Sequence, residues 1–564
     1  MANEDPLIQR TADCISWCRQ NGLLPVIIHS PEALSSKIFD SVPSDAIAGM
    51  VSGMGKTSLS LPSSPAKTRA VAIISPRTHG KFFNFHMARQ YRKAGVSCLV
   101  RETSHGWEKT RLSHFLIRRF LEKILWMTVG RVFGRIPCTS LRLGKGCLAL
   151  CAPHAPLYQP EQDGILMFNA SLGEGGAERQ LVNTLAGLRD LGHQNLHVLC
   201  EHLRFPPGSA FYLHQLEEKG IPATEIDRTY SREEKQALQS LLGIFGDAFR
   251  NIPEELAEPI VTYALEIIRR KPQVVHAWQD MTSVFAGFAA IIAGTPRILL
   301  CGRSLAPYNY PTSPRWLRAC YRILAQHPAV IMANNSRAGA KDYEKWLGLP
   351  EGRIGVLSNG FDGALFRKPS PDSIRAFKDS LGIPEGHAVI GTVARMSEEK
   401  DPFLFWETAK QLLAHHENLT VLHVGSGPLY ASLRKKVEES GHSSRYLMPG
   451  NMKDPVPAFS AMDVFLLTSR IEGTPNVILE AQALGIPVVS TNVGGAAETF
   501  ADGKTGFLVH TRKAEDLARK TSFILEHPEW AGIASHTAPD FIKNRFGLDA
   551  MLRKTLDFYK MAAS

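Results

Sequence analysis

The sequence predicts an α/β protein built on doubly wound parallel sheets. Residues 464–490 give the clearest observation, because two short apolar runs of strand type enclose a loop and a helix. Thr474 and Pro475 are typical of a helix start, as N-cap and first helical residue, and Gly485 is typical of a helix end. Strand-type and helix-type stretches also alternate from about residue 163 onwards, which favours parallel strands joined by crossover helices.

The chain of 564 residues is too long for a single hydrophobic core, so we expect several domains. The strand and helix patterns divide it into consecutive segments. These are a poorly defined N-terminal segment (1–65), a basic α/β extension (66–160), a first Rossmann-like domain (161–357), a second Rossmann-like domain (358–545) and a final helix (546–564).

Composition places the chain among ordinary globular proteins of a reducing compartment. Hydrophobic residues make up 44% of it, and its nine cysteines form no CxxC pair. We therefore expect free thiols and no metal site. The N-terminal residues lack the apolar segment of a signal peptide, and no run of eighteen apolar residues occurs. These features favour a cytoplasmic location without a membrane span.

The positive charge of the chain is local. Residues 66–150 contain 17 Lys and Arg against three acids, a net +14 in a chain whose total is +10. Within this segment, residues 114–127 have the pattern of an amphipathic helix with Arg118, Arg119 and Lys123 on its polar face. One interpretation is a helix whose apolar side packs in a core. The other is a basic helix on an anionic membrane surface, peripheral to the inner face of the membrane.

The sequence disfavours a P-loop, a dinucleotide-binding loop and a nucleic-acid-binding function. Gly53-Met-Gly55-Lys56-Thr57 lacks the first glycine of a P-loop, because that position is Met50. Gly173-x-Gly175 begins like a dinucleotide fingerprint, but Glu178 occupies the third glycine position. No nucleic-acid-binding motif accompanies the basic segment, so we expect no nucleic-acid partner.

The strand–loop–helix unit of residues 464–490 holds two carboxylates, Glu472 in the loop and Glu480 on the helix. Loops at the carboxyl ends of parallel strands bind ligands in doubly wound folds, and a helix start attracts anions. Such a site suits a ligand with a phosphate and several hydroxyls. The alternative is that both glutamates are solvated surface residues. His276 and Arg303 each follow or end a strand-type run, and for both a ligand role and a structural role stay open.

The spacing Glu472-x7-Glu480, followed by Gly485–Val489 and Gly494–Glu498, resembles the retaining family 4 glycosyltransferases of GT-B fold. Further segments fit the same family in order and distance. These are the Arg395-x4-Lys400 segment, Val424–Pro428 and Asn359–Asp362. The resemblance covers about residues 163–560. It implies two Rossmann-like domains facing a cleft, with the final helix crossing back to the first domain.

The resemblance also implies an activity and residue roles. The activity is transfer of a sugar from a nucleotide diphosphate sugar to an acceptor hydroxyl with retention, in polysaccharide, lipopolysaccharide or glycolipid synthesis. Arg395 and Lys400 would hold the diphosphate, Glu472 the donor sugar and Glu480 the ribose, and His276 matches a polar cleft position. The remaining donor-binding residues implied are Gly173, Gly175, Gly176, Gly425, Gly427, Gly473, Thr474, Pro475, Asn476 and Val477.

The partners implied are the nucleotide-sugar donor, as a substrate, and a glycan or lipid-linked acceptor. No Asp-x-Asp cluster ends a strand, so we expect no essential metal and no cofactor. The general base is not identified, and the leaving phosphate is a candidate for that role. Two alternatives stay open. One is a sugar-nucleotide epimerase or phosphorylase of the same fold, and the other is a non-catalytic scaffold that binds nucleotide or membrane.

Overall fold

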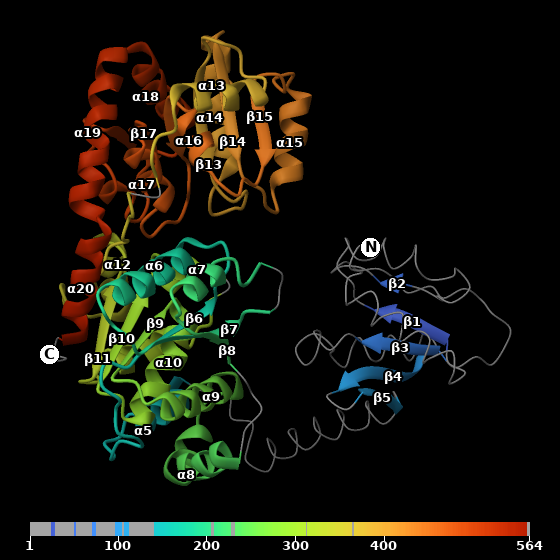
Figure 1. The fold of residues 1–564 in the computed structure, drawn as a ribbon, viewed down its shortest axis with the longest axis vertical. Helices are drawn as coiled ribbons and strands as arrows, with labels where there is room; N and C mark the ends of the chain where they lie inside the picture. Colours follow the sequence, from blue (N-terminus) through green and yellow to red (C-terminus); the bar gives the residue numbers. More distant parts are fainter. Residues whose placement is uncertain are drawn as a thin grey trace. The chain divides into compact units, whose positions relative to one another are not determined.

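The computed structural model divides into two units, Met1–Pro137 and Cys138–Ser564 (Figure 1). In the first unit the structure describes five strands. In the second it describes residues 140–204, 208–226, 232–311, 313–363 and 366–560.

The five strands of the first unit form one sheet in the order β2-β1-β3-β4-β5. They are β1 (Leu24–Ile28), β2 (Met50–Val51), β3 (Ala70–Ile74), β4 (Val96–Thr103) and β5 (Gly106–Arg111). The pairings are parallel except for β4 with β5, which is antiparallel. Two strands therefore come from the segment 1–65 that the sequence left undefined. The helix predicted over 114–127 lies outside the described residues.

The second unit begins with a seven-stranded parallel sheet in the order β12-β11-β10-β9-β6-β7-β8. Its strands are β6 (Ile165–Ser171), β7 (Leu196–His202), β8 (Ala223–Glu225), β9 (Val274–Trp278), β10 (Arg297–Gly302), β11 (Val330–Asn334) and β12 (Gly355–Val356). Its helices are α5 (Ser140–Leu150), α6 (Gly176–Asp190), α7 (Leu213–Glu218), α8 (Arg232–Phe249), α9 (Glu254–Arg270), α10 (Asp280–Ala293), η3 (Pro307–Asn309), α11 (Leu317–Leu324) and α12 (Arg337–Leu347).

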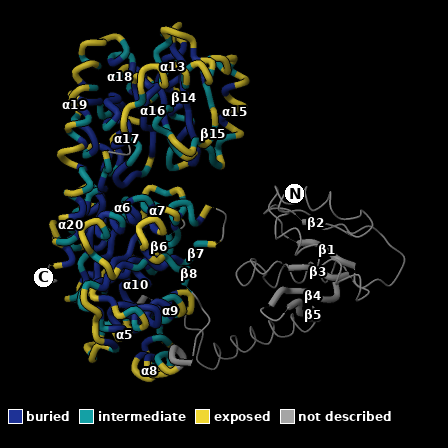
Figure 2. The backbone as a smooth tube through the Cα atoms, in the orientation of Figure 1, coloured by how far each residue is buried: buried dark blue, intermediate teal, exposed yellow. Residues whose placement is uncertain are grey.

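Successive strand residues of this sheet enter two different cores, as the alternation of side chains in a strand requires. Leu166 and Phe168 pack with α9, α10 and α11 on one face, whereas Ile165 and Met167 pack with α6 and α7 on the other. Because both faces are covered, the strands run through the buried interior of the domain (Figure 2). α10 is apolar almost all round and is correspondingly buried.

A six-stranded parallel sheet follows, in the order β15-β14-β13-β16-β17-β18. Its strands are β13 (Ala388–Val393), β14 (Leu419–Val424), β15 (Tyr446–Gly450), β16 (Val464–Leu467), β17 (Val488–Thr491) and β18 (Gly506–Val509). Its helices are α13 (Pro371–Ser380), α14 (Pro402–His415), α15 (Tyr430–Glu439), α16 (Val456–Ser460), α17 (Asn476–Ala483), η4 (Ala496–Glu498), α18 (Ala514–Glu526) and α19 (Pro528–Phe546). Two Rossmann-like sheets with helices on both faces make this a GT-B fold, as predicted.

The last described helix, α20 (Leu548–Lys560), joins the two domains. α19 packs on α17 of the second domain, and α20 then packs on α6 of the first (Figure 1). Leu552 and Phe558 of α20 are buried in the first domain's core. The chain therefore returns to the first domain at its end.

The structure groups residues 138–160 with the second unit and not with the extension predicted over 66–160. Leu143, Cys147 and Leu150 lie three or four positions apart on one face of α5 and are buried in the first domain's core. The basic composition of the neighbouring stretch concealed this apolar face.

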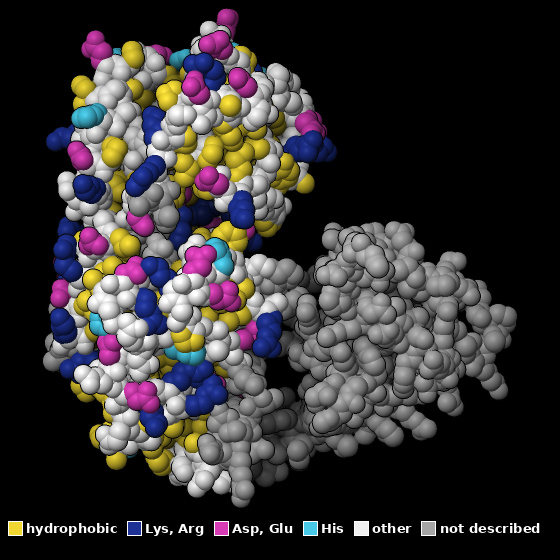
Figure 3. Space-filling view, in the orientation of Figure 1, with side chains coloured by type: hydrophobic (Ala, Val, Ile, Leu, Met, Phe, Trp, Pro, Cys, Tyr) yellow, Lys and Arg dark blue, Asp and Glu magenta, His cyan; other side chains and the backbone are white. Residues whose placement is uncertain are grey.

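The described part of the second unit carries charges of both signs. On the face drawn in Figure 3, Lys and Arg side chains are interspersed with Asp and Glu over both domains. Among the described residues, no helix combines the length and apolar character that crossing a membrane requires.

Candidate functional site

Lys400 and Glu472 meet at the carboxyl ends of two neighbouring parallel strands. β13 leads into the loop of residues 394–401, and β16 leads into the loop of residues 468–475. Lys400 Nζ donates to Glu472 Oε1 at 2.6 Å. The Glu472 side chain is 8% exposed and that of Lys400 is 28% exposed, so the pair is shielded but reachable. The structure therefore brings together two residues that lie 72 positions apart.

Arg395 lies in the loop that also carries Lys400, and its side chain is exposed. Two glycines after β14 shape this loop. Gly425 and Gly427 have φ of +129° and +157°, and a Cβ atom would lie 2.0 Å from Ala394 O and 2.6 Å from Met396 O respectively. Only glycine fits both the backbone conformation and the space. These glycines therefore support the Arg395 loop by letting it pack closely.

Glu480 is paired with a cation from the other domain. It lies on α17, is 2% exposed, and accepts a hydrogen bond from Arg179 of α6 through Oε1. Burying a carboxylate is costly unless a positive charge and hydrogen bonds compensate. Arg179 supplies both here. A carboxylate has about four lone-pair positions, so the pair leaves further acceptor capacity on Glu480.

The start of α17 lies against the first domain. Asn476 Oδ1 accepts from Asn359 Nδ2 at 2.6 Å, and Asn476 Nδ2 donates to Gly176 O at 3.3 Å. A Cβ atom on Gly176 would lie 2.7 Å from Asn476 Nδ2, so the glycine permits this approach. Gly473 similarly has no room for a Cβ atom, which would lie 2.4 Å from Arg303 O. The glycines at these two positions therefore act in the contact between the domains.

The prediction that Thr474 caps α17 is wrong. The helix begins at Asn476, its N-cap is Pro475, and no side chain caps it. The Thr474 hydroxyl instead donates to Asn335 O of the first domain at 2.7 Å. The hydroxyl thus donates to a carbonyl oxygen far away in the chain instead of accepting from an N–H group of its own helix. Val477, the second residue of the helix, is partly buried.

The glycine-rich loop of residues 173–176 ends β6 and opens α6, with Gly175 as the N-cap. Glu178 Oε1 accepts from Gln279 Nε2 at 2.9 Å. A Cβ atom on Gly175 would lie 1.9 Å from Glu178 Oε2, so the carboxyl folds back against the loop. Burial raises the pKa of Glu178 above its usual range. Gly173 precedes this turn and is partly exposed.

The structure places His276 in the core, and the prediction that it faces the cleft is wrong. It is 0% exposed, Nδ1 lies 2.9 Å from Tyr559 Oη, and Nε2 lies 3.2 Å from Cys301 Sγ. Burial, aided by the charge of Arg303, lowers its pKa to about 3, so the ring is neutral near pH 7. The physical reason is that every residue of β9 is buried and that Tyr559 of α20 covers this side of the sheet.

Arg303 lies between the domains, although the sequence left its role open. Its guanidinium carbon is 4.3 Å from the centre of the Trp278 ring, and its NH2 group donates to Asn359 Oδ1 at 2.6 Å. Asn359 in turn contacts Asn476, so a chain of hydrogen bonds links β10 to α17. Burial lowers the pKa of Arg303 to about 10, which leaves it charged at neutral pH.

Sequence reasoning missed Arg179, Asn335 and Glu498 as parts of the site. Glu498 Oε1 and Oε2 accept from Ala338 N at 2.9 Å and Arg337 N at 3.1 Å, so a carboxylate of the second domain caps α12 of the first. Glu498 ends the segment Gly494–Glu498, and Arg179 follows Gly176 by three positions. Their closeness to these glycines was the available signal, but their partners are far away in the chain.

Two family profiles match the chain, one after the other. Glycosyltransferase Family 4 matches residues 174–364, and Glycosyl transferases group 1 matches residues 373–540. Each match falls on one of the two Rossmann-like domains. The chain therefore belongs to the family 4, group 1 glycosyltransferases of GT-B fold and is a glycosyltransferase.

Relatives with assigned names support the same class. The chain is 27% identical to the Vi polysaccharide biosynthesis protein VipC/TviE of Salmonella typhi over 456 residues, 74% of this chain and 77% of that protein. It is 27% identical over 256 residues to a D-inositol 3-phosphate glycosyltransferase of Corynebacterium urealyticum, which is 44% of this chain and 60% of that protein. It is 24% identical over 298 residues, 52% of this chain and 76% of that protein, to the UDP-Gal:alpha-D-GlcNAc-diphosphoundecaprenol alpha-1,3-galactosyltransferase of Escherichia coli.

Solved structures share the fold at lower identity. HepE of Anabaena, in complex with UDP, aligns with a TM-score of 0.56 at 22% identity over 70% of this chain and 98% of that one. A glycosyltransferase of Rickettsia africae aligns with a TM-score of 0.57 at 20% identity over 70% of this chain and 97% of that one.

Proposed function

We propose that the protein transfers a sugar from a nucleotide diphosphate sugar to a hydroxyl of a glycan or lipid-linked acceptor. We further propose that it does so with retention, in the synthesis of a polysaccharide, lipopolysaccharide or glycolipid. The observation that carries the proposal is the Lys400–Glu472 pair beside the start of α17, at the carboxyl ends of β13 and β16. A cation, a carboxylate and a helix start at one sheet edge suit a phosphorylated polyol.

Charge development on the leaving diphosphate is the main barrier that the site has to lower. Arg395 and Lys400 are the cations of the loop after β13, and preorganised cations stabilise an oxyanion in the transition state. An ammonium has three donors, so Lys400 can contact a phosphate oxygen while it still donates to Glu472. Glu472 then accepts from hydroxyls of the donor sugar, and Glu480 from those of the ribose.

Retention follows when the acceptor oxygen attacks the face of the sugar that the diphosphate leaves. The bond between the anomeric carbon and the acceptor oxygen forms as the bond to the phosphate oxygen breaks. The acceptor proton passes to the departing phosphate oxygen, so the step needs no protein base. Buried His276 takes no part in this scheme, because both of its ring nitrogens contact core residues.

The named relatives suggest which donor to test first. The Escherichia coli relative is named for UDP-Gal, and the Anabaena structure holds UDP. The experiment is incubation of the enzyme with UDP-, GDP- and ADP-sugars, with and without candidate acceptors, followed by detection of nucleoside diphosphate and sugar products. We expect product only when an acceptor is present. An altered nucleotide sugar or sugar phosphate formed without acceptor would instead support an epimerase or phosphorylase.

We propose that transfer requires no bound metal, because Arg395 and Lys400 supply the positive charge at the diphosphate. Activity should then be unchanged in the presence of excess EDTA. Complete loss of activity on chelation, with recovery on adding Mg²⁺ or Mn²⁺, would contradict this part of the proposal.

We propose that the basic segment brings the enzyme to a lipid-linked acceptor at the cytoplasmic face of the membrane. The sequence pattern of residues 114–127, within a segment of net charge +14, supports this. Each Lys or Arg near an anionic surface contributes about 1 kcal/mol. Wild type should therefore co-sediment with anionic liposomes, less so at high salt, and the Arg118/Arg119/Lys123→Glu variant should not. Equal binding of both to neutral liposomes would contradict the electrostatic attachment.

A further inference from the structure

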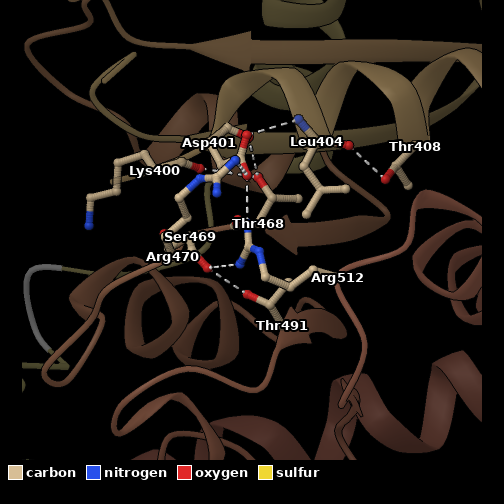
Figure 4. Close-up of polar contacts among 9 residues, drawn as sticks. All are labelled: Lys400, Asp401, Leu404, Thr408, Thr468, Ser469, Arg470, Thr491 and Arg512. Carbon is tan, nitrogen blue, oxygen red and sulfur yellow. Dashed lines mark hydrogen bonds and ion pairs between the residues drawn. The ribbon is translucent and has the colours of Figure 1, made fainter. Parts of the chain in front are cut away.

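The residue after Lys400 is a buried carboxylate held by two guanidinium groups. Asp401 is 7% exposed, and its Oδ2 atom accepts from Arg512 NH2 at 2.6 Å and from Arg470 NH2 at 2.7 Å (Figure 4). Its other oxygen, Oδ1, accepts from Leu404 N at 3.3 Å and so caps α14. Asp401 is thus the N-cap of α14, and its carboxylate also makes two ion pairs that a helix cap does not need.

The backbone of Asp401 is in the left-handed region, with φ of 49° and ψ of 62°. Only four non-glycine residues of the described part of the chain have positive φ, and such a conformation disfavours any side chain bearing a Cβ atom. Glycine would hold this backbone at lower cost. The presence of Asp, not Gly, indicates that the carboxylate itself has a role.

Arg512 connects Asp401 to the loop that carries Glu472. Besides Asp401, it donates to Ser469 O at 2.6 Å and to Thr468 O at 3.0 Å. The Thr468 hydroxyl donates back across the gap, to the carbonyl oxygens of Lys400 at 3.2 Å and Asp401 at 3.1 Å. Figure 4 shows the Arg470 and Arg512 side chains directed toward Asp401, with Thr468 and Ser469 beside them.

Arg470 adds a second connection between the same loops. Its side chain donates to Asp401, and its backbone N–H donates to Glu399 O at 2.7 Å. Residues 399–401 are therefore joined to residues 468–470 through both side chains and backbone. Lys400 is the middle residue of the first segment, Glu472 follows the second segment by two residues, and their side chains meet.

We propose that Asp401 and Arg512 form a positioning clamp that fixes the Lys400 ammonium relative to the Glu472 carboxylate for sugar transfer. The inference rests on the proposed function, in which Lys400 and Glu472 contact the donor. Neither Asp401 nor Arg512 touches substrate in this scheme. The clamp acts by holding the two loops in register, and misplacement of a reacting group by about 1 Å can cost about 10²-fold in rate.

The test separates the carboxylate of Asp401 from its backbone conformation. Asp401→Gly retains the left-handed backbone and removes the charge, and Asp401→Asn retains the shape and the cap. We expect kcat to fall by about 10²-fold in Asp401→Gly and by less in Asp401→Asn. Donor Kd should change by less than about threefold in both, because the ribose contact at Glu480 is untouched.

Arg512 offers a second route that removes a partner of Asp401 and leaves residue 401 itself unchanged. We expect Arg512→Ala to lower kcat about as much as Asp401→Gly does, and Arg512→Lys to lower it less. Guanidinium ion at non-denaturing concentration should restore part of the activity of Arg512→Ala. Loss of kcat with donor Kd retained separates a positioning role from general disruption of the domain. Arg519→Ala is the matched control, because Arg519 lies in α18 nearby and pairs with Asp516 at the surface.

Two outcomes would overturn the clamp. One is wild-type kcat in both Asp401→Gly and Arg512→Ala while Lys400→Ala is inactive, which would leave the proposed function intact. The other is an equal loss of donor affinity and kcat without guanidinium rescue, which would indicate general disruption of the domain. Wild-type activity in Lys400→Ala would contradict the proposed function itself.

Discussion

Arg179 of the first domain and Glu480 of the second are ion-paired, although 301 positions separate them in the chain. The Glu480 side chain is only 3% exposed, so its charge is balanced by a residue of the other domain. The carboxylate proposed to bind the ribose is thus held by an arginine of the other domain. That proposed contact would couple donor binding to the relative position of the two domains.

Substitution of Glu480 should weaken donor binding. Loss of a hydrogen bond to a charged group costs about 1.5–3 kcal/mol, which is roughly 10- to 150-fold in Kd. We expect Glu480→Ala to raise the donor Kd within this range, measured by calorimetric titration. Arg179→Ala should also raise Kd, because it leaves a buried carboxylate without its counterion. Unchanged Kd in both variants would remove Glu480 from the donor site.

Substitution of the two cations should impair the chemical step. We expect Arg395→Ala and Lys400→Ala each to lower kcat/KM by about 10²- to 10³-fold, the range for removing one group that stabilises an oxyanion. Glu472→Ala should mainly lower kcat. Lys410→Ala is the control, because Lys410 is an exposed lysine on α14. Activity within about threefold of wild type in both cation variants would place the diphosphate elsewhere.

The contact between Glu498 and α12 should stabilise the two-domain unit. Glu498 accepts from the first two N–H groups of a helix in the other domain, where a negative charge is favourable. Glu498→Ala should therefore lower stability by about 0.5–2 kcal/mol, the range for losing a helix cap. The measurement is the melting temperature of Glu498→Ala. The control is Glu385→Ala, which removes an exposed glutamate of the same domain. Identical melting temperatures for the two variants would show that the contact contributes nothing.

Buried histidines should make the protein less stable in mild acid. Burial lowers the pKa of His276 and His423 to about 3, whereas both take up protons below about 6.5 when the chain unfolds. Stability is therefore fully present above about pH 6.5 and falls as pH drops toward 3, by about 1.4 kcal/mol per unit for each histidine.

The measurement for this prediction is the melting temperature between pH 7 and 5. We expect His423→Phe to reduce the decline on acidification, since that variant has one fewer site for proton uptake on unfolding. His510→Gln removes an exposed histidine and should leave the decline unchanged. An equal decline in wild type and His423→Phe would mean that His423 titrates normally in the folded protein.

Local patterns predicted the strand–loop–helix–strand unit closely. Residues 464–490 were expected to form it, and the structure has β16, α17 and β17 there. Apolar runs, turn residues and their spacing determine such a unit within a few turns of chain. For the same reason the loop carrying Glu472 and the helix carrying Glu480 could be placed from sequence.

The partners of these residues could not be placed, because they depend on long-range packing. The sequence around Glu480 gives no sign that Arg179 will pair with it. The sequence around Thr474 likewise gives no sign that its hydroxyl will donate to Asn335 O. His276 was misplaced for the same reason. A helix almost 300 residues later, α20, supplies the Tyr559 hydroxyl that lies 2.9 Å from its ring nitrogen.

The most direct test of the account compares donor binding by wild type with donor binding by variants of Glu480 and Lys400. Wild type, Glu480→Ala and Lys400→Ala are titrated with UDP-, GDP- and ADP-sugars, and the melting temperature is followed, since a ligand that binds the folded state raises it. We expect at least one nucleotide sugar to raise the melting temperature of wild type and to do so less in both variants. No shift with any nucleotide sugar, or equal shifts in all three proteins, would contradict the assignment of the donor site.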